Sequence, residues 1–219
     1  MPAPAADNLR VVDLSHPISP GMPVWPGSPA PELGPLATIR EDAFAEQSIR
    51  ISSHTGTHLD APAHMIEGGA TLDSFPAGHF FGRAALVDAR CVSTGRIGLS
   101  LLEPNRDAIS SADFLLLHTG WANFWGGAGY GSGYPVLDDA AAAWIAGIGL
   151  RCVGIDAPSV DPADSDVFPV HRRLLGSGLL LAENLTNLHL LPPGSCALGI
   201  FPLPVRGAEA CPARAVAFL

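Results

Sequence analysis

Charged side chains are scarce in this chain of 219 residues, and no run of Lys or Arg forms a basic stripe. Charged residues make up 15% of the sequence, with 12 Lys and Arg against 21 Asp and Glu and a net charge of −9. Without a basic stripe, the composition argues against a nucleic-acid partner. The low charge fraction also indicates that some surface is buried in an oligomer.

The sequence also lacks a segment suited to a membrane or to export. The longest apolar stretch, residues 137–150, is interrupted by Asp138 and Asp139, and it is too short and too polar to span a bilayer. The first seven residues have neither the basic nor the apolar region of a signal peptide. We therefore expect a cytoplasmic protein with no membrane partner.

Cysteine is present at only four positions, and no two cysteines form a Cys-x-x-Cys pair. Cys152 and Cys196 lie in apolar runs typical of strands, where a thiol behaves as a small buried hydrophobic group. We expect reduced thiols, as is usual in the cytosol, and a disulfide bridge is the alternative.

The remaining composition predicts one compact domain over residues 1–219, with residues 1–8 as a flexible tail. Hydrophobic residues make up 47% of the chain, enough for a sizeable core, while 24 Gly and 21 Pro predict many turns and short elements. Expected strands outnumber expected helices, which indicates an α/β fold with a mixed sheet. Strands are expected at residues 11–14, 48–53, 84–88, 114–118, 151–156, 178–181, 196–200 and 214–218, and helices at residues 138–148 and 169–175.

Two loops stand out between these elements. Residues 17–35 carry seven prolines, which predicts an extended loop, and Trp25 within it is a candidate lid or pocket wall. The alternative for Trp25 is a cap on the core. Residues 126–133 are rich in glycine, but no strand leads into them and no Gly-Lys-Ser/Thr follows, so we interpret them as a flexible loop.

The densest chemical signal is HTGTHLDAPAH, residues 54–64. His54, His58, Asp60 and His64 share an even spacing, so an extended backbone would direct them to one side. Imidazole and carboxylate are the ligands that zinc and manganese bind. Glycine and proline within the segment argue for a turn-rich loop. The pattern predicts a metal site, against the alternative of a polar loop with scattered histidines.

A metal site usually draws further ligands from distant segments, and two residues are candidates. His171 lies in the first turn of an expected helix, and Glu183 follows an apolar strand, where a buried carboxylate needs a partner. His16 and His118 could also reach the site, whereas His79 and His189 have no supporting context. Asp156 and Asp161 are expected to shape turns rather than to bind metal, and Ser177 lies outside any Gly-x-Ser-x-Gly motif.

Taken together, these motifs resemble the cyclase-like metal-dependent hydrolases, the family that includes bacterial kynurenine formamidase and isatin hydrolase. HTGTHLDAPAH looks like the family signature. DLSHP, GMPVWPG, LHTG, VGIDAPSVDP and ENL agree with the family in order along the chain, at residues 13–17, 21–27, 117–120, 153–162 and 183–185. The resemblance covers the chain from about residue 11 to its end.

The resemblance implies a swivelling β/β/α fold, a homodimer and a divalent metal, Zn²⁺ or Mn²⁺, with one or two ions per subunit. In members with two ions, Asp60 bridges them and Glu183 is a candidate second bridge. The implied ligands are His54, His58 and Asp60 for one ion, and Asp60, His171 and Glu183 for the other. His64 matches the family's proton-transfer residue, and Trp25 matches an aromatic wall of the substrate pocket.

The expected activity is hydrolysis of a small aromatic amide, with N-formylkynurenine cleaved to kynurenine and formate. A metal-bound hydroxide would attack the carbonyl carbon, and His64 would serve as general acid and base. One alternative substrate is a cyclic amide such as isatin. Another alternative is a metal-stabilised protein that binds a small molecule without turnover. A serine or thiol hydrolase lacks a convincing nucleophile motif.

Overall fold

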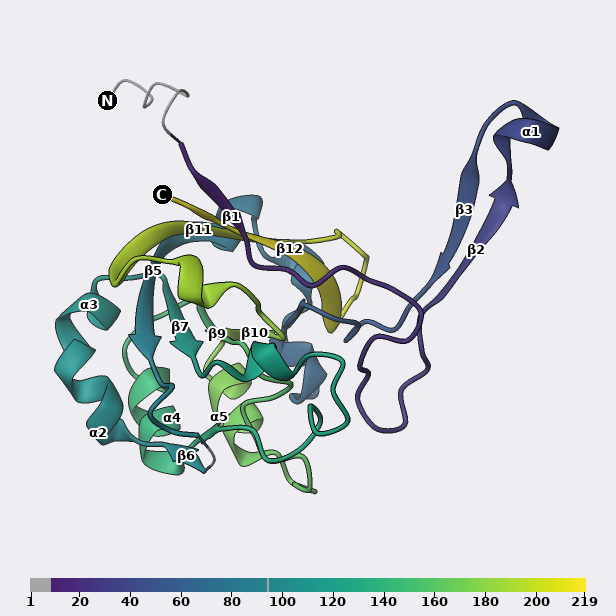
Figure 1. Ribbon diagram of the computed structural model, residues 1–219. Coiled ribbons are helices and arrows are strands. Elements are labelled where there is room, and N and C mark those ends of the chain that lie inside the picture. Colours follow the sequence, from purple (N-terminus) through teal and green to yellow (C-terminus); the bar gives the residue numbers. More distant parts are fainter. Residues whose placement is uncertain (1–8, 94) are drawn as a thin grey trace.

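One curved sheet organises this protein, seen in a computed structural model that describes residues 9–93 and 95–219 (Figure 1). Within these residues, eight strands hydrogen-bond in the order β1-β12-β11-β5-β7-β9-β10-β4. Their bounds are β1 Val11–Asp13, β4 His58–Asp60, β5 Phe81–Asp88, β7 Phe114–His118, β9 Cys152–Ile155, β10 Leu180–Glu183, β11 Gly194–Pro202 and β12 Ala210–Phe218. The expected tail, residues 1–8, lies outside the described residues.

The sheet closes on itself because β12 pairs with β4 as well as with β11 and β1. Strands β5, β7, β9 and β10 are parallel to one another, whereas β1, β4, β11 and β12 pair antiparallel with their neighbours. The result is a barrel-like mixed sheet, which confirms the expected α/β class.

Each central strand is buried on both faces. In β7, Leu115 and Leu117 pack toward the helices, while Phe114 and Leu116 belong to a second apolar cluster on the opposite side of the sheet. Because successive side chains in a strand point to opposite faces, a strand covered on both sides is apolar throughout. The continuous run at 114–118 therefore forms the strand expected from the sequence, with the same bounds.

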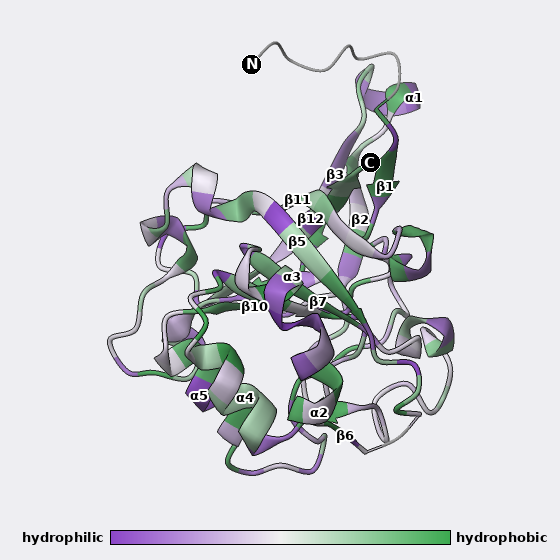
Figure 2. Cartoon of the chain, turned by 90° about the vertical axis from the view of Figure 1, so that its left-hand side faces the viewer, coloured by the Kyte–Doolittle hydropathy of each residue, from purple (hydrophilic) through white to green (hydrophobic). Residues whose placement is uncertain are grey.

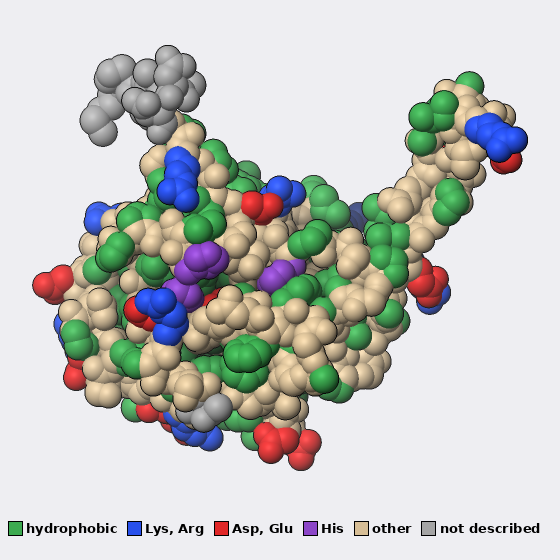
Figure 3. Space-filling view, in the orientation of Figure 1, with side chains coloured by type: hydrophobic (Ala, Val, Ile, Leu, Met, Phe, Trp, Pro, Cys, Tyr) green, Lys and Arg blue, Asp and Glu red, His purple; other side chains and the backbone are tan. Residues whose placement is uncertain are grey.

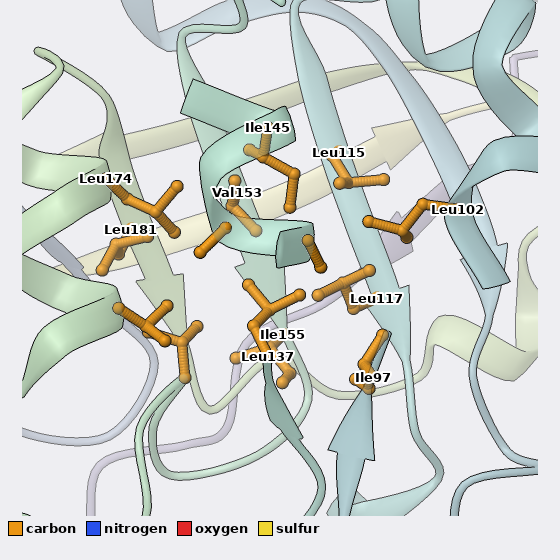
Figure 4. Packing of buried hydrophobic residues seen from close by; sticks show 14 of the residues in the cluster. Ile97, Leu102, Leu115, Leu117, Leu137, Ile145, Val153, Ile155, Leu174 and Leu181 are labelled. Carbon is orange, nitrogen blue, oxygen red and sulfur yellow. The ribbon is translucent and has the colours of Figure 1, made fainter. Parts of the chain in front are cut away.

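Helices cover one side of the sheet, as Figure 1 shows for α2 to α5. Figure 4 shows Ile145, Leu174 and Leu102 reaching from the helical layer toward strand residues such as Leu117 and Ile155. In Figure 2 the helices present hydrophobic and hydrophilic stretches side by side, as expected for elements with one buried face. The bounds are α2 Leu99–Leu102, α3 Arg106–Ser110, α4 Asp139–Ala146 and α5 Pro169–Gly176. A separate two-stranded sheet is formed by β6 Arg96–Ile97 and β8 Val136–Leu137.

A hairpin projects away from this body, and here the expected strand is partly wrong (Figure 1). The alternation in residues 48–53 predicted a strand leading directly to His54, but the observed strand is β3, Glu46–Arg50, which pairs with β2, Glu32–Ala37. Every residue of β3 is exposed, so the alternation there does not mark a buried face. The proline-rich loop accordingly ends earlier than expected. A proline in a two-stranded edge ribbon is tolerated because few ladder bonds are lost.

The tip of the hairpin carries the short helix α1, Ile39–Asp42, capped by the Thr38 hydroxyl. None of the described helices has both the length and the apolar content needed to cross a membrane.

Candidate metal centre and pocket

Two antiparallel strands bring the first group of polar residues together. In the pairing of β10 with β4, Glu183 lies opposite His58, and Leu181 lies opposite Asp60. The intervening Leu59 packs into the second apolar cluster, so His58 and Asp60 point to the other face, where Glu183 also lies. All three polar residues are buried.

Asp60 is at the centre of the cluster that results. Its Oδ1 lies 2.9 Å from His54 Nδ1 and 3.3 Å from His58 Nε2, and its Oδ2 lies 3.7 Å from His171 Nε2. Glu183 completes the group, with Oε1 3.2 Å from His171 Nε2 and Oε2 3.6 Å from His58 Nε2. The structure therefore gathers the five residues that the family resemblance implied as ligands.

The donors of this cluster fit a divalent ion. Among the described residues, His58 Nε2 and both oxygens of Asp60 are buried and make no hydrogen bond. Buried polar atoms without partners are costly and require an explanation, and a bound cation between imidazole nitrogens and carboxylate oxygens provides one. Two sets of ligand atoms lie close enough to share an ion, and Asp60 belongs to both. They are His54, Asp60 and His64, and His58, Asp60 and Glu183.

Hydrogen bonds behind the cluster orient two of its imidazoles. His58 Nδ1 lies 2.9 Å from the Gly56 carbonyl oxygen, and His171 Nδ1 lies 2.8 Å from Asp161 Oδ2. Each bond occupies the nitrogen that faces away, so Nε2 is presented to the carboxylates. Gly56 has a φ of 64°, and a Cβ at this position would meet the Met22 side chain at 2.9 Å. Only glycine suits this turn without strain.

Asp161 has a larger role than the sequence predicted. Its carboxylate accepts bonds from the Val170 and His171 amides at the start of α5, which is the expected turn-shaping role. The same carboxylate also holds the His171 ring, and this second role was missed. The available signal was the buried helical histidine, because such a ring needs a partner for its second nitrogen.

Buried charges shift the pKa values within the centre. Burial by itself would raise the pKa of Asp60, but the neighbouring imidazoles hold it well below its usual range. Burial would lower the pKa of His58, but the carboxylates of Asp60 and Glu183 raise it to about 9. At His64, burial prevails and lowers the pKa. The carboxylates of Asp60 and Glu183 thus favour positive charge on His58 beside them.

A cavity of about 390 Å³ opens above these candidate ligands. Its walls include Trp25 from the proline-rich loop, Phe168 from the turn before α5, and Tyr130 from the glycine-rich segment. The structure thus places Trp25 in the wall of this cavity. Gly127 and Gly131 also line the cavity, which places the glycine-rich segment at the site, a location that its sequence did not predict.

Tyr130 anchors that segment to the strands that carry the imidazole–carboxylate cluster. Its hydroxyl donates to Asn184 Oδ1 at 2.7 Å, and Asn184 Nδ2 donates to the Gly56 carbonyl oxygen at 3.0 Å. The Thr57 hydroxyl donates to the Asn184 carbonyl oxygen at 2.6 Å. Tyr130 and Asn184 thereby connect the glycine-rich segment to the residues beside His58. Neither was singled out from the sequence.

The other histidines lie outside the cavity lining. His16 stacks on Trp125, with ring centroids 3.8 Å apart and planes inclined by 6°. His118 is buried at the end of β7, next to the turn in which the Asp156 carboxylate accepts bonds from the Thr119 and Gly120 amides. The turn-shaping role expected for Asp156 is therefore observed. His189 is exposed. Figure 3 shows histidine side chains at the surface on the side of the molecule seen in Figure 1.

The sheet, the helical layer and the buried His/carboxylate cluster define an α/β protein with a candidate divalent-metal centre. The family model described as a putative cyclase matches residues 12–162, and the chain belongs to this family.

Named relatives extend the match to nearly the whole chain. A kynurenine formamidase from Salinibacter ruber is 35% identical over 95% of this chain and 97% of its own length. A solved structure titled as a predicted metal-dependent hydrolase from Bacillus stearothermophilus has a TM-score of 0.80 and 31% identity, covering 96% of this chain and 98% of that one. Isatin hydrolase A from Labrenzia aggregata shares the fold, with a TM-score of 0.87 and 23% identity, covering 96% of this chain and 94% of that one.

Proposed function

We propose that this protein is a metal-dependent amide hydrolase that cleaves an aryl formamide, N-formylkynurenine, to kynurenine and formate. The observation that carries the proposal is a buried cluster of imidazoles and carboxylates at the floor of a cavity walled by aromatic rings. The similarity to kynurenine formamidases over nearly the full chain supports the same reaction.

The proposed metal is Zn²⁺, with Mn²⁺ as the alternative, and one or two ions are held per subunit. His54, His58 and Asp60 would hold one ion, and Asp60, His171 and Glu183 would hold the second. When bound, such an ion acts as a Lewis acid that polarises a carbonyl oxygen and lowers the pKa of water toward about 7. The central place of Asp60, within 4 Å of three imidazoles, supports its role as the shared ligand.

The residues of the chain would bind the substrate and move the proton. Trp25 offers a flat surface to the aromatic ring, while the amide carbonyl points to the cluster. His64, with its ring centroid 4.3 Å from that of His54, would take a proton from the attacking water and pass it to the departing amine nitrogen. The C–O bond to the water oxygen would form first, and the C–N bond would then break as the nitrogen receives the proton. Because burial lowers the pKa of His64, the ring is neutral and able to accept a proton at neutral pH.

We also propose that the protein works as a homodimer in which the β2–β3 hairpin packs on a second copy. The hairpin projects from the body (Figures 1 and 3) and exposes large apolar side chains at Leu36, Ile39, Phe44 and Ile49. An isolated two-stranded hairpin is marginally stable in water, so a packing partner would stabilise it.

The cytoplasm is the proposed compartment, since all four cysteines lie in the described residues and none is paired.

The test is hydrolysis of N-formylkynurenine by protein of measured metal content, before and after removal of metal by a chelator, with isatin assayed in parallel. We expect turnover of the formamide that is lost on chelation and restored by Zn²⁺ or Mn²⁺. Asp60→Ala should lose bound metal, because it removes the carboxylate that three imidazoles share. Turnover of isatin alone would reassign the substrate to a cyclic amide. Chelator-resistant turnover, or full metal occupancy in Asp60→Ala, would refute the proposed centre.

A further inference from the structure

Phe168 has a backbone conformation that bulky residues rarely adopt. Its φ is 44° and its ψ is 59°, in the left-handed region. In the described part of the chain, three other non-glycine residues have a positive φ, namely Ala43, Asn184 and Asn187. Asparagine tolerates this region and alanine is small, whereas a bulky side chain there is strained. Strain of this kind is often found at functional sites, where the surrounding structure maintains it.

The aromatic side chain of Phe168 does not cap helix α5. Phe168 is the residue before the helix, where Ser, Thr, Asp or Asn usually accepts a bond from the first amides. Phe168 provides no such bond, and the Asp161 carboxylate caps the helix instead. The ring is only half-buried, and it belongs to neither apolar core cluster. Core packing therefore does not explain the phenylalanine.

The ring of Phe168 is instead part of the cavity wall. Its centroid lies 6.5 Å from that of Trp25, with the planes tilted by 56°, and 6.0 Å from that of His171, in an edge-to-face contact. Trp25 comes from the proline-rich loop, so two distant segments each supply one aromatic face. The amide of Phe168 donates to the Ser165 hydroxyl at 3.0 Å, which holds the turn in place.

We propose that Phe168 and Trp25 form an aromatic clamp that selects substrates with an aryl group on the amide nitrogen. The left-handed backbone at Phe168 sets the direction of the Cα–Cβ bond and so presents the ring to the cavity. The contact with His171 places the clamp next to the carboxylate–imidazole cluster. This inference rests on the proposed function, which it deepens by naming a specificity-determining residue.

The test uses three variants of the full-length, metal-loaded protein. Phe168→Asn removes the ring and suits the left-handed backbone, whereas Phe168→Leu keeps an apolar side chain and retains the strain. Ala43→Gly is the matched control, because it relieves a left-handed residue at φ 66° at the end of α1, in the projecting hairpin. For each variant we would measure the Tm, the metal content, kynurenine binding by calorimetry, and hydrolysis of formanilide and N-cyclohexylformamide.

For Phe168→Asn we expect the Tm to rise by about 2–4 °C and kynurenine binding to weaken by about threefold to tenfold. The activity loss should be larger for formanilide than for N-cyclohexylformamide and should fall mainly on KM. Phe168→Leu should show a similar loss of selectivity without the rise in Tm. Ala43→Gly should raise the Tm and leave binding and metal content unchanged.

Two results would overturn the clamp. One is Phe168→Asn binding kynurenine as tightly as the wild type. The other is a lower Tm in that variant with unchanged selectivity, which would make Phe168 a packing residue. Failure of the proposed function is distinguishable, because the wild type would then hydrolyse neither formamide. Wild-type protein that also fails to bind kynurenine would overturn the clamp together with that function.

Discussion

His64 lies beside the imidazole–carboxylate cluster, where it could carry a proton or bind a metal, and substitution separates these two roles. Its ring is close to both His54 and His171, and its side chain falls within the group formed with His54 and Asp60. In the proposed role of proton carrier, His64 would be needed for turnover but not for metal binding. We predict that His64→Ala keeps its metal content and loses about 10²–10⁴-fold in kcat, as expected for loss of general acid–base catalysis.

Metal content by mass spectrometry and kcat on N-formylkynurenine check this prediction. The exposed His189 is a suitable control, because His189→Ala removes a histidine outside the cavity lining. Loss of one ion in His64→Ala would make His64 a ligand instead, and normal turnover would remove it from the mechanism.

His16 makes stability depend on pH. Burial lowers its pKa from 6.5 to about 4, and its Nε2 has no hydrogen-bond partner among the described residues. Between pH 6.5 and 4 the unfolded chain therefore binds more protons than the folded one, so this residue destabilises the fold as the pH falls through that window. Above pH 6.5 the ring is neutral in both states and contributes no pH dependence.

We predict that His16→Phe, which keeps a ring on Trp125 but cannot be protonated, loses less stability between pH 7 and 5 than the wild type does. Urea unfolding at both pH values measures this difference, because the other titrating groups are common to both proteins. Equal pH dependence in the two proteins would contradict the assignment to His16.

At the scale of elements, the β2–β3 hairpin projects from the body of the molecule, and its two strands pair with each other. We predict that replacing residues 35–47 with Asn-Gly, which favours a tight hairpin turn, converts a dimer into a monomer with little change in Tm. All residues of β3 are exposed, so few intramolecular contacts are lost. Light scattering after size-exclusion chromatography gives the mass, and Phe44→Ser is a milder variant at an exposed apolar position. A shortened chain that remains dimeric, or a monomeric wild type, would refute the hairpin-mediated dimer.

The elements differ in how well local sequence predicted them. Strand β7 and helix α5 were close to expectation, because an uninterrupted apolar run and a proline at the first helical position are strong local signals. The hairpin was less predictable, because alternation identifies a half-buried strand only where one face is actually buried. Ile49 follows the alternation but is 61% exposed.

At the scale of the whole molecule, closure of the sheet assembles the site. Strand β4 is hydrogen-bonded between β10 and β12, so residues near position 58 are fixed against residues near 183 and 212. Helix α5 then supplies His171 from the layer above. Because these segments are far apart in the chain, the candidate metal centre is assembled only when the barrel-like sheet closes.

The sequence by itself determined the fold class, the family resemblance and the set of candidate ligands. Imidazoles and carboxylates at residues 54–64, with His171 and Glu183, carry a chemical signal that needs no coordinates. Only the tertiary structure revealed that Asp161 orients His171, that Tyr130 and Asn184 brace the Gly56 carbonyl, and that Phe168 faces Trp25. These contacts join residues distant in sequence. Their geometry depends on strand register and on the φ angles of single residues, which composition and spacing do not specify.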